Sequence, residues 1–564
     1  MDSLSFGTLD SSSGAPRLSG TASKLDTAAI VEATYEAKRI PAVRLETKIT
    51  RNEARLAAYQ EMRSLLSDVQ SALAPLRNPP GFFGARDNIF ENKQAFFASS
   101  TNTDPSSLLG VSVGNSAQKG SFEISVDALA VAEKRATAST SSADQTLADG
   151  WNGAAAFSGT IDIGLDGGTV ATIAVDGTMD IYDLRDAINA QSSTSRVRAN
   201  VLQVASGDFR LILNAEDTGK AITIGDASGI TGGFATTQLQ ASAAASFTID
   251  GVAITRDGNQ IEDLVDGVTI DLYKAESGTK VTVSIEPALG SVKEQIASFV
   301  ESYNAFRDFV DLQSAVSATG EVAEDAVLFG DRAMRSVVQG LANVVGGGVT
   351  GLDPGALTSL RDIGITLDAT NHLTVDDTEL DQALLTDVAG VRGLFEFSYT
   401  SSSSDLAVFA RTNALADDAF TIDIVDADAD GVPESVTIDG IAAEIDGSTI
   451  RGVEGTAYEG LELLWIGSGS VSIDVRATQG VADRMFNFLD ENLDVFEGSI
   501  GRASASLEDL NRDYAAQVLK IEERAERARS DLIERFSAME AALSIANAML
   551  EQIRSQVDAM TGNV

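Results

Sequence analysis

The stretch "LEDLNRDYAAQVLKIEERAERARSDLIERFSAMEAALSIANAMLEQI", residues 507–553, carries an apolar stripe at helical spacing and contains no Pro or Gly. Apolar residues recur every three or four positions, which is typical of a coiled coil. They are Leu507, Leu510, Tyr514, Val518, Ile521, Ala525, Ala528, Leu532, Phe536, Met539, Leu543, Ala546, Leu550, Ile553, Val557 and Met560. At about 1.5 Å per residue, the predicted helix is about 80 Å long.

A helix with one apolar face needs a partner of similar length. The comparable stripe lies near the other end of the chain, in residues 25–76, and comprises Leu56, Tyr59, Met62, Leu66, Val69, Leu73 and Leu76. Pro41 predicts a break or kink near Ile40, and "RNPPGFFG" at residues 77–84 predicts the end of the helix. The two ends of the chain should therefore pack side by side, with the remaining residues as outgrowths between them.

The N-terminal stripe is too short and too interrupted to cover residues 536–560 fully. The uncovered part predicts contacts with other copies of the chain or with a neighbouring protein. The residues predicted to form this assembly surface are Leu56, Tyr59, Met62, Leu66, Leu73, Leu510, Tyr514, Val518, Ile521, Leu532, Phe536, Met539, Leu543, Leu550 and Ile553.

Between the two stripes the pattern alternates between β structure and short helices. Residues 85–287 read as β-rich with one short helix, "DIYDLRDAINAQSS". Helical spacing returns at residues 291–315, and residues 361–385 predict a hairpin followed by a helix. Residues 401–480 are again β-like and very acidic.

Two segments of about 60 residues share order and spacing, which predicts an internal repeat. The first begins "FTIDGVAITRDG" at Phe247, and the second begins "VTIDGIAAEIDG" at Val436. Each has a T-I-D-G turn, a second D-G turn, a strand after S-G and then a helix. We therefore expect two related β units, each inserted in the chain so that it leads back into one helical body.

The bulk composition excludes several classes of site. With no cysteine, the chain has no disulfide, thiolate zinc site or cysteine nucleophile. The net charge of −42 disfavours nucleic acid and anionic lipid as partners. No apolar run is long enough to span a bilayer, and the N-terminus lacks a secretory signal pattern. These two features alone predict a cytoplasmic location.

The single histidine, His372, is predicted to lie solvated in a turn. No nucleophile, acid–base pair or cofactor motif stands out, so we expect no enzyme activity and no cofactor.

One acidic motif has two possible interpretations, a calcium-binding loop or a solvated turn. Asp426, Asp428 and Asp430 alternate before Gly431, which is how a calcium loop begins. The twelfth position is Thr437 rather than the expected glutamate. The candidate calcium ligands are thus Asp426, Asp428 and Asp430, and a solvated acidic turn is the favoured alternative.

Several segments, taken in order, resemble the family of flagellar filament-capping proteins, the hook-associated protein 2 family. They are "LDTAAIVEATYEAKRIPAVRLETKI" near the N-terminus, "GSFEISVDALAVAEK", "GNQIEDLVDGVTIDL", "FVESYNAF" and "LRDIGITLDATNHLTVDDTELDQAL". Residues 171–224 resemble the insert motif of flagellin and hook proteins. "RFSAMEAALSIANAMLEQI" resembles the family's closing signature. The chain departs from the family at "LSGTASKLD", where a Gly-rich start is usual, and at Tyr35, where Met is usual.

The resemblance implies an α+β multidomain fold in which paired terminal helices form a helical leg with β-rich domains inserted between them. The expected parts are a disordered segment with a terminal helix (1–45), a leg (46–84, 288–400 and 481–530), an inner β domain (85–136 and 245–287), an outer β domain (137–244), an acidic β insertion (401–480) and a terminal helix (531–564).

The resemblance also implies a structural function. These proteins form a small ring, expected to be a pentamer, at the tip of the flagellum, and they help exported flagellin to fold and insert. The implied partners are further copies of the chain, flagellin, and the flagellar export apparatus with its chaperone. Export would proceed through the flagellar type III apparatus without a cleaved signal, giving an extracellular location instead of a cytoplasmic one. The alternatives are a junction or filament subunit, and a secreted hydrolase or calcium-dependent adhesin.

Overall fold

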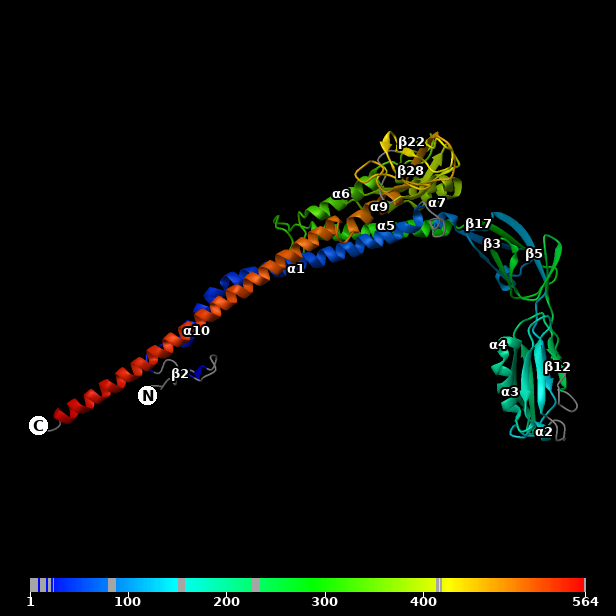
Figure 1. The fold of residues 1–564 in the computed structure, drawn as a ribbon, viewed down its shortest axis with the longest axis horizontal. Coiled ribbons are helices and arrows are strands. Elements are labelled where there is room, and N and C mark those ends of the chain that lie inside the picture. The colour runs from blue at the N-terminus through cyan, green and yellow to red at the C-terminus, as the bar shows by residue number, and fades with distance from the viewer. Residues whose placement is uncertain are drawn as a thin grey trace. The chain divides into compact units, whose positions relative to one another are not determined.

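The computed structural model describes residues 9–10, 17–18, 22–23, 25–79, 88–150, 158–225, 234–411, 415 and 418–561. It divides into two compact units (Figure 1). The terminal unit contains Met1–Asp87 and Lys293–Val564, and the inserted unit contains Asn88–Val292. Most of the segment predicted to be disordered, residues 1–20, lies outside the described residues. Its described part is an antiparallel pair, β1 (Leu9–Asp10) and β2 (Arg17–Leu18).

Two long helices dominate the terminal unit: α1 (Thr27–Leu73) and α10 (Ser499–Thr561) lie side by side (Figure 1). The apolar stripe of α1 is buried as predicted, with Met62, Leu66 and Leu73 fully inaccessible to solvent. Further helices complete this body: η1 (Ala74–Leu76), α5 (Leu289–Gln313) from Lys293 onward, α6 (Arg332–Gly346) and α9 (Val481–Leu493). The sequence patterns did not identify α6.

Of the two alternatives predicted at Pro41, the break is wrong, because α1 runs through this residue without interruption. Proline removes one backbone donor and leaves the carbonyl of Ala37 without its usual partner. Both Pro41 and Ala37 lie on the exposed face of α1, so water can bond that carbonyl. The neighbouring Ala42 is completely buried, so the packed face of the helix continues past the proline.

The predicted hairpin and helix after residue 360 are confirmed. The elements are η5 (Leu360–Ile363), β18 (Ile365–Leu367), β19 (Leu373–Val375), α7 (Asp377–Thr386) and α8 (Val388–Phe395). Asp376 caps α7 by accepting the backbone N–H groups of Thr378 and Glu379. These elements pack their apolar residues, including Leu380 and Phe395, into the core of the terminal unit.

The described residues of the inserted unit form two hydrophobic cores. The sheets around the first core are β14-β13-β5-β17-β3 and β15-β16-β4. The bounds are η3 (Ile89–Glu91), β3 (Lys93–Ser99), η4 (Pro105–Ser107), β4 (Leu109–Val113), β5 (Gly120–Ala128), β13 (Ala245–Ile249), β14 (Val252–Arg256), β15 (Gln260–Val265), β16 (Val268–Leu272) and β17 (Val281–Pro287).

The second core lies between the sheets β12-β6-β10-β9 and β11-β7-β8 and the short helices. The bounds are β6 (Lys134–Thr137), α2 (Leu147–Gly150), β7 (Gly159–Leu165), β8 (Ala171–Val175), α3 (Ile181–Ala190), α4 (Ser192–Ser195), β9 (Val197–Ala205), β10 (Asp208–Ala215), β11 (Ile222–Ile224) and β12 (Thr236–Gln240). The short helix predicted at "DIYDLRDAINAQSS" is α3, whose N-cap Asp180 forms a capping box with Asp183.

The predicted acidic β region is a two-sheet module within the terminal unit, and we call it the acidic module. Its sheets are β20-β28-β22-β23-β24 and β21-β27-β26-β25, and they share one core. The bounds are β20 (Phe397–Ser401), β21 (Leu406–Arg411), β22 (Ala419–Val425), β23 (Ser435–Ile438), β24 (Ile441–Ala442), β25 (Glu444–Asp446), β26 (Thr449–Arg451), β27 (Leu461–Trp465) and β28 (Val471–Gln479).

The predicted repeat is visible in the sheet topology. The order β14-β13-β5-β17-β3 in the inserted unit matches β24-β23-β22-β28-β20 in the acidic module, strand for strand. Strands β17 and β28 each lead into a helix, α5 and α9 respectively. The chain therefore contains the same β unit twice.

The two turns that define the repeat also share their hydrogen bonds. Asp250 and Asp439 both have positive φ, 48° and 47°, and each is followed by a glycine with positive φ. Asp250 accepts the N–H of Glu123 at 2.9 Å and returns its own N–H to the Glu123 carbonyl. Asp439 makes the same reciprocal pair with Thr421. An Asp-Gly pair suits this turn because both residues tolerate the left-handed region.

A buried ionic cluster joins the acidic module to the helices of the terminal unit. Arg411 on β21 donates to Asp483 on α9, and both side chains are completely buried. Arg77 lies 3.6 Å from the other oxygen of Asp483 and stacks over Phe486 at 3.9 Å. Burial lowers the pKa of Arg77. One carboxylate thus offsets two buried guanidinium groups.

Candidate functional site: the paired terminal helices

Polar contacts set the register of α1 against α10. Glu32 pairs with Arg529 at 3.3 Å, and Arg39 pairs with Glu522 at 3.2 Å. The residue number on α10 falls as the residue number on α1 rises, so the two helices are antiparallel. At the far end of this pairing, the buried carboxylate of Glu540 accepts the backbone N–H groups of Ala22 and Ser23. Glu540 lies in the closing segment that resembled the family signature.

An asparagine pair lies within the interface between the two helices. Asn52 is 8% exposed and donates its Nδ2–H to Asn511 Oδ1 at 2.8 Å. The predicted stripe had placed Leu510 here, but Leu510 is 38% exposed and Asn511 takes the inward position. The search for apolar spacing missed both asparagines. A lone asparagine in a coiled-coil stripe fixes register at a cost in stability, and that signal could have revealed them.

We expect a double-mutant cycle on this pair to show coupling. Asn52→Ala or Asn511→Ala should each destabilise the terminal unit by about 1–2 kcal/mol, because each leaves the other amide of the interface without its partner. The double variant should cost less than the sum of the two single changes. Denaturant unfolding followed by circular dichroism gives these free energies. Additive effects would show that the two amides do not interact in solution.

Four of the predicted assembly residues lie in the core of the chain itself. Tyr59, Met62, Leu66 and Leu73 are at most 2% exposed, so their side chains are not available to a second chain. The hydroxyl of Tyr59 donates to Asp331 at 2.7 Å, and Asp331 also caps α6. Burial, together with this hydrogen bond, raises the pKa of Tyr59.

Among the remaining predicted residues, exposure increases along α10 from Val518 to Ile553. Val518 is 9% exposed, and Leu550 and Ile553 are each 55% exposed. The half-buried residues are Leu56, Tyr514, Ile521, Leu532, Phe536, Met539 and Leu543. Contact with α1 therefore covers the middle of the stripe and decreases toward the C-terminal end.

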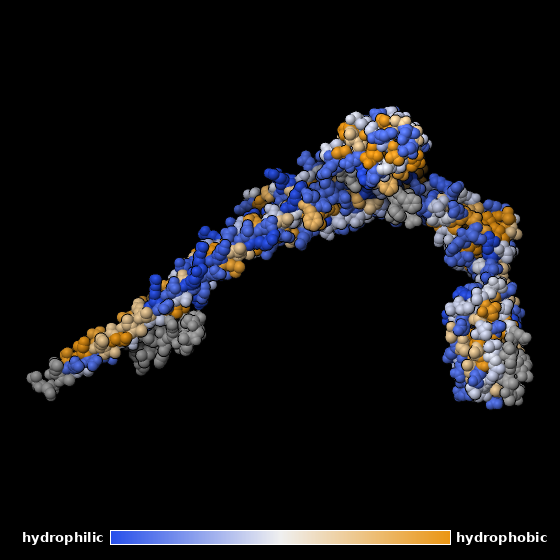
Figure 2. Space-filling view, in the orientation of Figure 1, coloured by the Kyte–Doolittle hydropathy of each residue, from blue (hydrophilic) through white to orange (hydrophobic). Residues whose placement is uncertain are grey.

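The end of α10 exposes a run of large apolar side chains, which we call the terminal stripe. Its members are Ile545, Met549, Leu550, Ile553 and Val557, all between 51% and 60% exposed. Figure 1 shows α10 continuing past the first turn of α1, and Figure 2 shows hydrophobic residues gathered on this stretch. Large exposed apolar patches of this kind typically mark interaction surfaces.

The structure brings together only part of the predicted calcium set. Carboxylate oxygens of Asp426, Asp428 and Glu434 lie within 4.8 Å of one another. Asp430 is absent from this group, and its Oδ1 accepts the N–H of Val432. Sequence reasoning missed Glu434 because it looked for a glutamate at the twelfth position, whereas Glu434 stands at the ninth.

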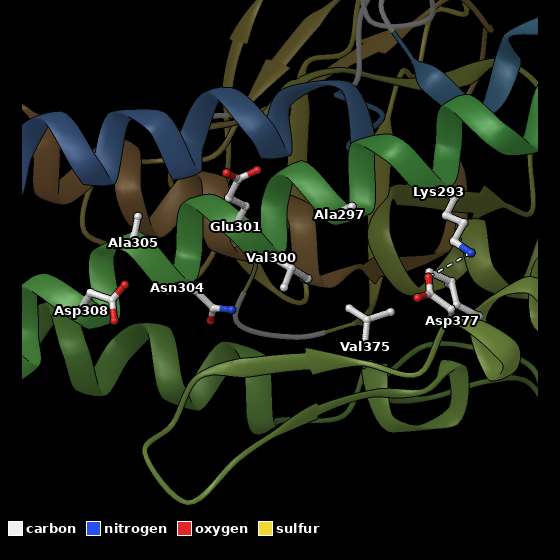
Figure 3. A pocket seen from close by; sticks show the side chains of 10 residues that line it. Lys293, Ala297, Val300, Glu301, Asn304, Ala305, Asp308, Val375 and Asp377 are labelled. Carbon is white, nitrogen blue, oxygen red and sulfur yellow. Dashed lines mark ion pairs between the residues drawn. The ribbon is translucent and has the colours of Figure 1, made fainter.

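An open groove of about 610 Å³ lies between α5 and the segment from β19 to α7 (Figure 3). Lys293 forms ion pairs with Asp381 at 2.7 Å and with Asp377 at 2.9 Å. The hydrogen bond to Asp381, followed by that to Asp377, raises the pKa of Lys293. The cation is thus already neutralised. His372 lies near this groove in the predicted turn, but it is half-buried and bonds Asp308 at 3.1 Å. The predicted turn is confirmed, but the imidazole is only partly solvated.

Within the part of the chain that the structure describes, no helix combines the length and the apolar character required to cross a membrane.

Family models match most of the chain. The model described as "Flagellar hook-associated protein 2 C-terminus" matches residues 242–548, and that of the N-terminus matches residues 23–133. The model of the flagellin hook IN motif matches residues 160–217.

Individual relatives agree with these matches. The B-type flagellar hook-associated protein 2 of Pseudomonas aeruginosa is 28% identical over 367 residues, which cover 60% of this chain and 72% of the relative. The A-type protein of the same species is 27% identical over 416 residues, covering 67% and 80%. A crystal structure of the flagellar cap protein FliD D1-D2-D3 domains from Escherichia coli aligns at 22% identity with a TM-score of 0.44, covering 60% of this chain and 89% of that one.

Proposed function

Because the chain belongs to the flagellar hook-associated protein 2 family, we propose that it caps the distal end of a bacterial flagellar filament and promotes the folding and insertion of exported flagellin. The family models and relatives support a cap protein of the flagellum. They favour neither a junction subunit nor a secreted hydrolase or adhesin. The proposed role is structural and requires no catalytic group.

The terminal stripe is the observation that carries the assembly part of this proposal. Its five side chains are more than half exposed, and a ring of identical chains would bury them against neighbouring copies. We propose a closed ring, with a pentamer as the expected number of copies. A closed ring suits a cap because it ends a filament, whereas an open arrangement would continue as a polymer.

The proposed location is extracellular, at the tip of the filament. Delivery would use the flagellar export apparatus and its chaperone without a cleaved signal. The composition is compatible with this route, because a chain without cysteine cannot form disulfides on leaving a reducing compartment.

A deletion strain tests the proposed function. We expect it to release unpolymerised flagellin into the medium and to swim poorly, and the wild-type chain should restore filaments. Immunogold labelling of an epitope-tagged chain should mark the distal filament tip. Label at the hook end or along the filament would contradict the proposal, as would normal filaments in the deletion strain.

A further inference from the structure

The loop between β22 and β23 in the acidic module has the donor spacing of a calcium loop. Counting Asp426 as the first position, Asp428 is third, Gly431 is sixth and Glu434 is ninth. Calcium loops take oxygen ligands at alternate early positions, a glycine at the sixth for the sharp turn, and a further ligand at the ninth. Gly431 has a φ of +86°, a conformation that glycine adopts without strain.

The buried carboxylate of Asp426 provides an independent indication that this loop binds a cation. Its side chain is 2% exposed. The Oδ2 atom accepts the N–H groups of Gly469 at 2.8 Å and Gly431 at 3.1 Å. The Oδ1 atom is buried and has no hydrogen-bond partner. An unpaired buried carboxylate oxygen is costly, and a cation beside it would remove that cost.

The neighbouring carboxylates lie where they could share such a cation. Oxygens of Asp428 and Glu434 lie within 4.8 Å of an oxygen of Asp426, and both residues are exposed. The backbone N–H of Ala427 donates to Glu434 Oε2 at 2.9 Å, which holds this side chain over the loop. The sequence contains no Lys or Arg between Ala419 and Ile450, so the nearby sequence supplies no positive side chain for these three carboxylates.

We propose that Asp426, Asp428 and Glu434 bind one calcium ion. All three donors are hard carboxylate oxygens on a loop, which suits calcium; magnesium requires near-ideal octahedral geometry and retains its waters. Zinc prefers imidazole and thiolate, and neither is present at this site. Because Asp426 also bonds Gly469, which precedes β28, the ion would tie the β22–β23 loop to the strand that leads into α9.

Calcium titration of the purified full-length protein, first treated with chelator, tests the proposal. Isothermal titration calorimetry should detect one dominant site that is filled at about 1 mM calcium, the range of extracellular calcium modules. Glu434→Gln and Asp428→Asn should each weaken binding about tenfold or more, because each removes one ligand charge. Both residues are exposed, so the variants should still fold.

Glu454→Gln is the matched control, because it removes the same charge from an exposed site in the same module. It should bind calcium as the wild type does, and about 1 mM magnesium should not occupy the site. Calcium should also raise the unfolding temperature of the wild type but not that of the two ligand variants. The proposal is overturned if no heat is detected, or if all four proteins bind calcium equally.

Discussion

Replacing Leu550 and Ile553 together by glutamate is expected to leave the chain folded but unable to assemble. Both side chains are 55% exposed in the single chain, so the charges are tolerated there. In an assembly they would be buried without partners, and the resulting penalty should weaken association by more than about a hundredfold. Native mass spectrometry and sedimentation velocity would measure the loss of oligomer, and the unfolding midpoint should stay unchanged.

The control for this variant is Ser544→Glu with Ser555→Glu. These serines are exposed on the side of α10 opposite the terminal stripe, so the same added charge should leave assembly intact. In a motile strain, the Leu550 and Ile553 double variant should release flagellin into the medium and the serine variant should not. Normal oligomers from the leucine and isoleucine variant would show that the terminal stripe is not an assembly surface.

Asp483→Asn is expected to destabilise the terminal unit by about 3–5 kcal/mol, the cost of breaking a buried ion pair. The substitution keeps the shape of the side chain but removes the negative charge that Arg411 and Arg77 contact. Both arginines would then remain buried beside a neutral amide. Because Arg411 lies on β21, which pairs with β27, the acidic module should loosen first.

Trp465 on β27 provides a local probe for this change. The chain has two tryptophans, so Trp151→Phe leaves Trp465 as the only tryptophan, and tryptophan fluorescence then reports on β27 alone. Denaturant unfolding in that background should show a lower midpoint for Asp483→Asn. Glu491→Ala, an exposed change at the end of the same helix, should have an effect within about 0.5 kcal/mol of zero. Equal midpoints for the two variants would mean that the cluster contributes nothing to the stability of the module.

The α+β architecture could be predicted from the sequence because its signals are long and periodic. The stripes of α1 and α10 extend over many turns, so single exceptions did not hide them. The two copies of the β unit were detectable because T-I-D-G turns need specific residues at specific positions. The finer division into domains remains a prediction.

The errors came from positions where tertiary context overrides a local rule. Proline usually breaks a helix, but the sequence alone does not reveal that the Ala37 carbonyl, which Pro41 leaves without a donor, faces water. Leu510 fitted the apolar spacing, yet Asn511 faces inward because Asn52 lies opposite it. Spacing also could not separate the core from the proposed assembly surface, because both consist of apolar residues at the same spacing. That distinction depends on which parts of α10 have α1 beside them.

The pairing of α1 with α10 also constrains the order of folding. Asn52 meets Asn511, and Ala22 and Ser23 meet Glu540, so these contacts join residues more than 450 positions apart. A chain that emerges from a narrow channel one end first would expose one long helix well before its partner. The interface between these helices could close only after nearly the whole polypeptide had emerged, whereas each β module could fold from its own residues beforehand. On the proposed export route, completion of the helical interface would thus mark the end of translocation.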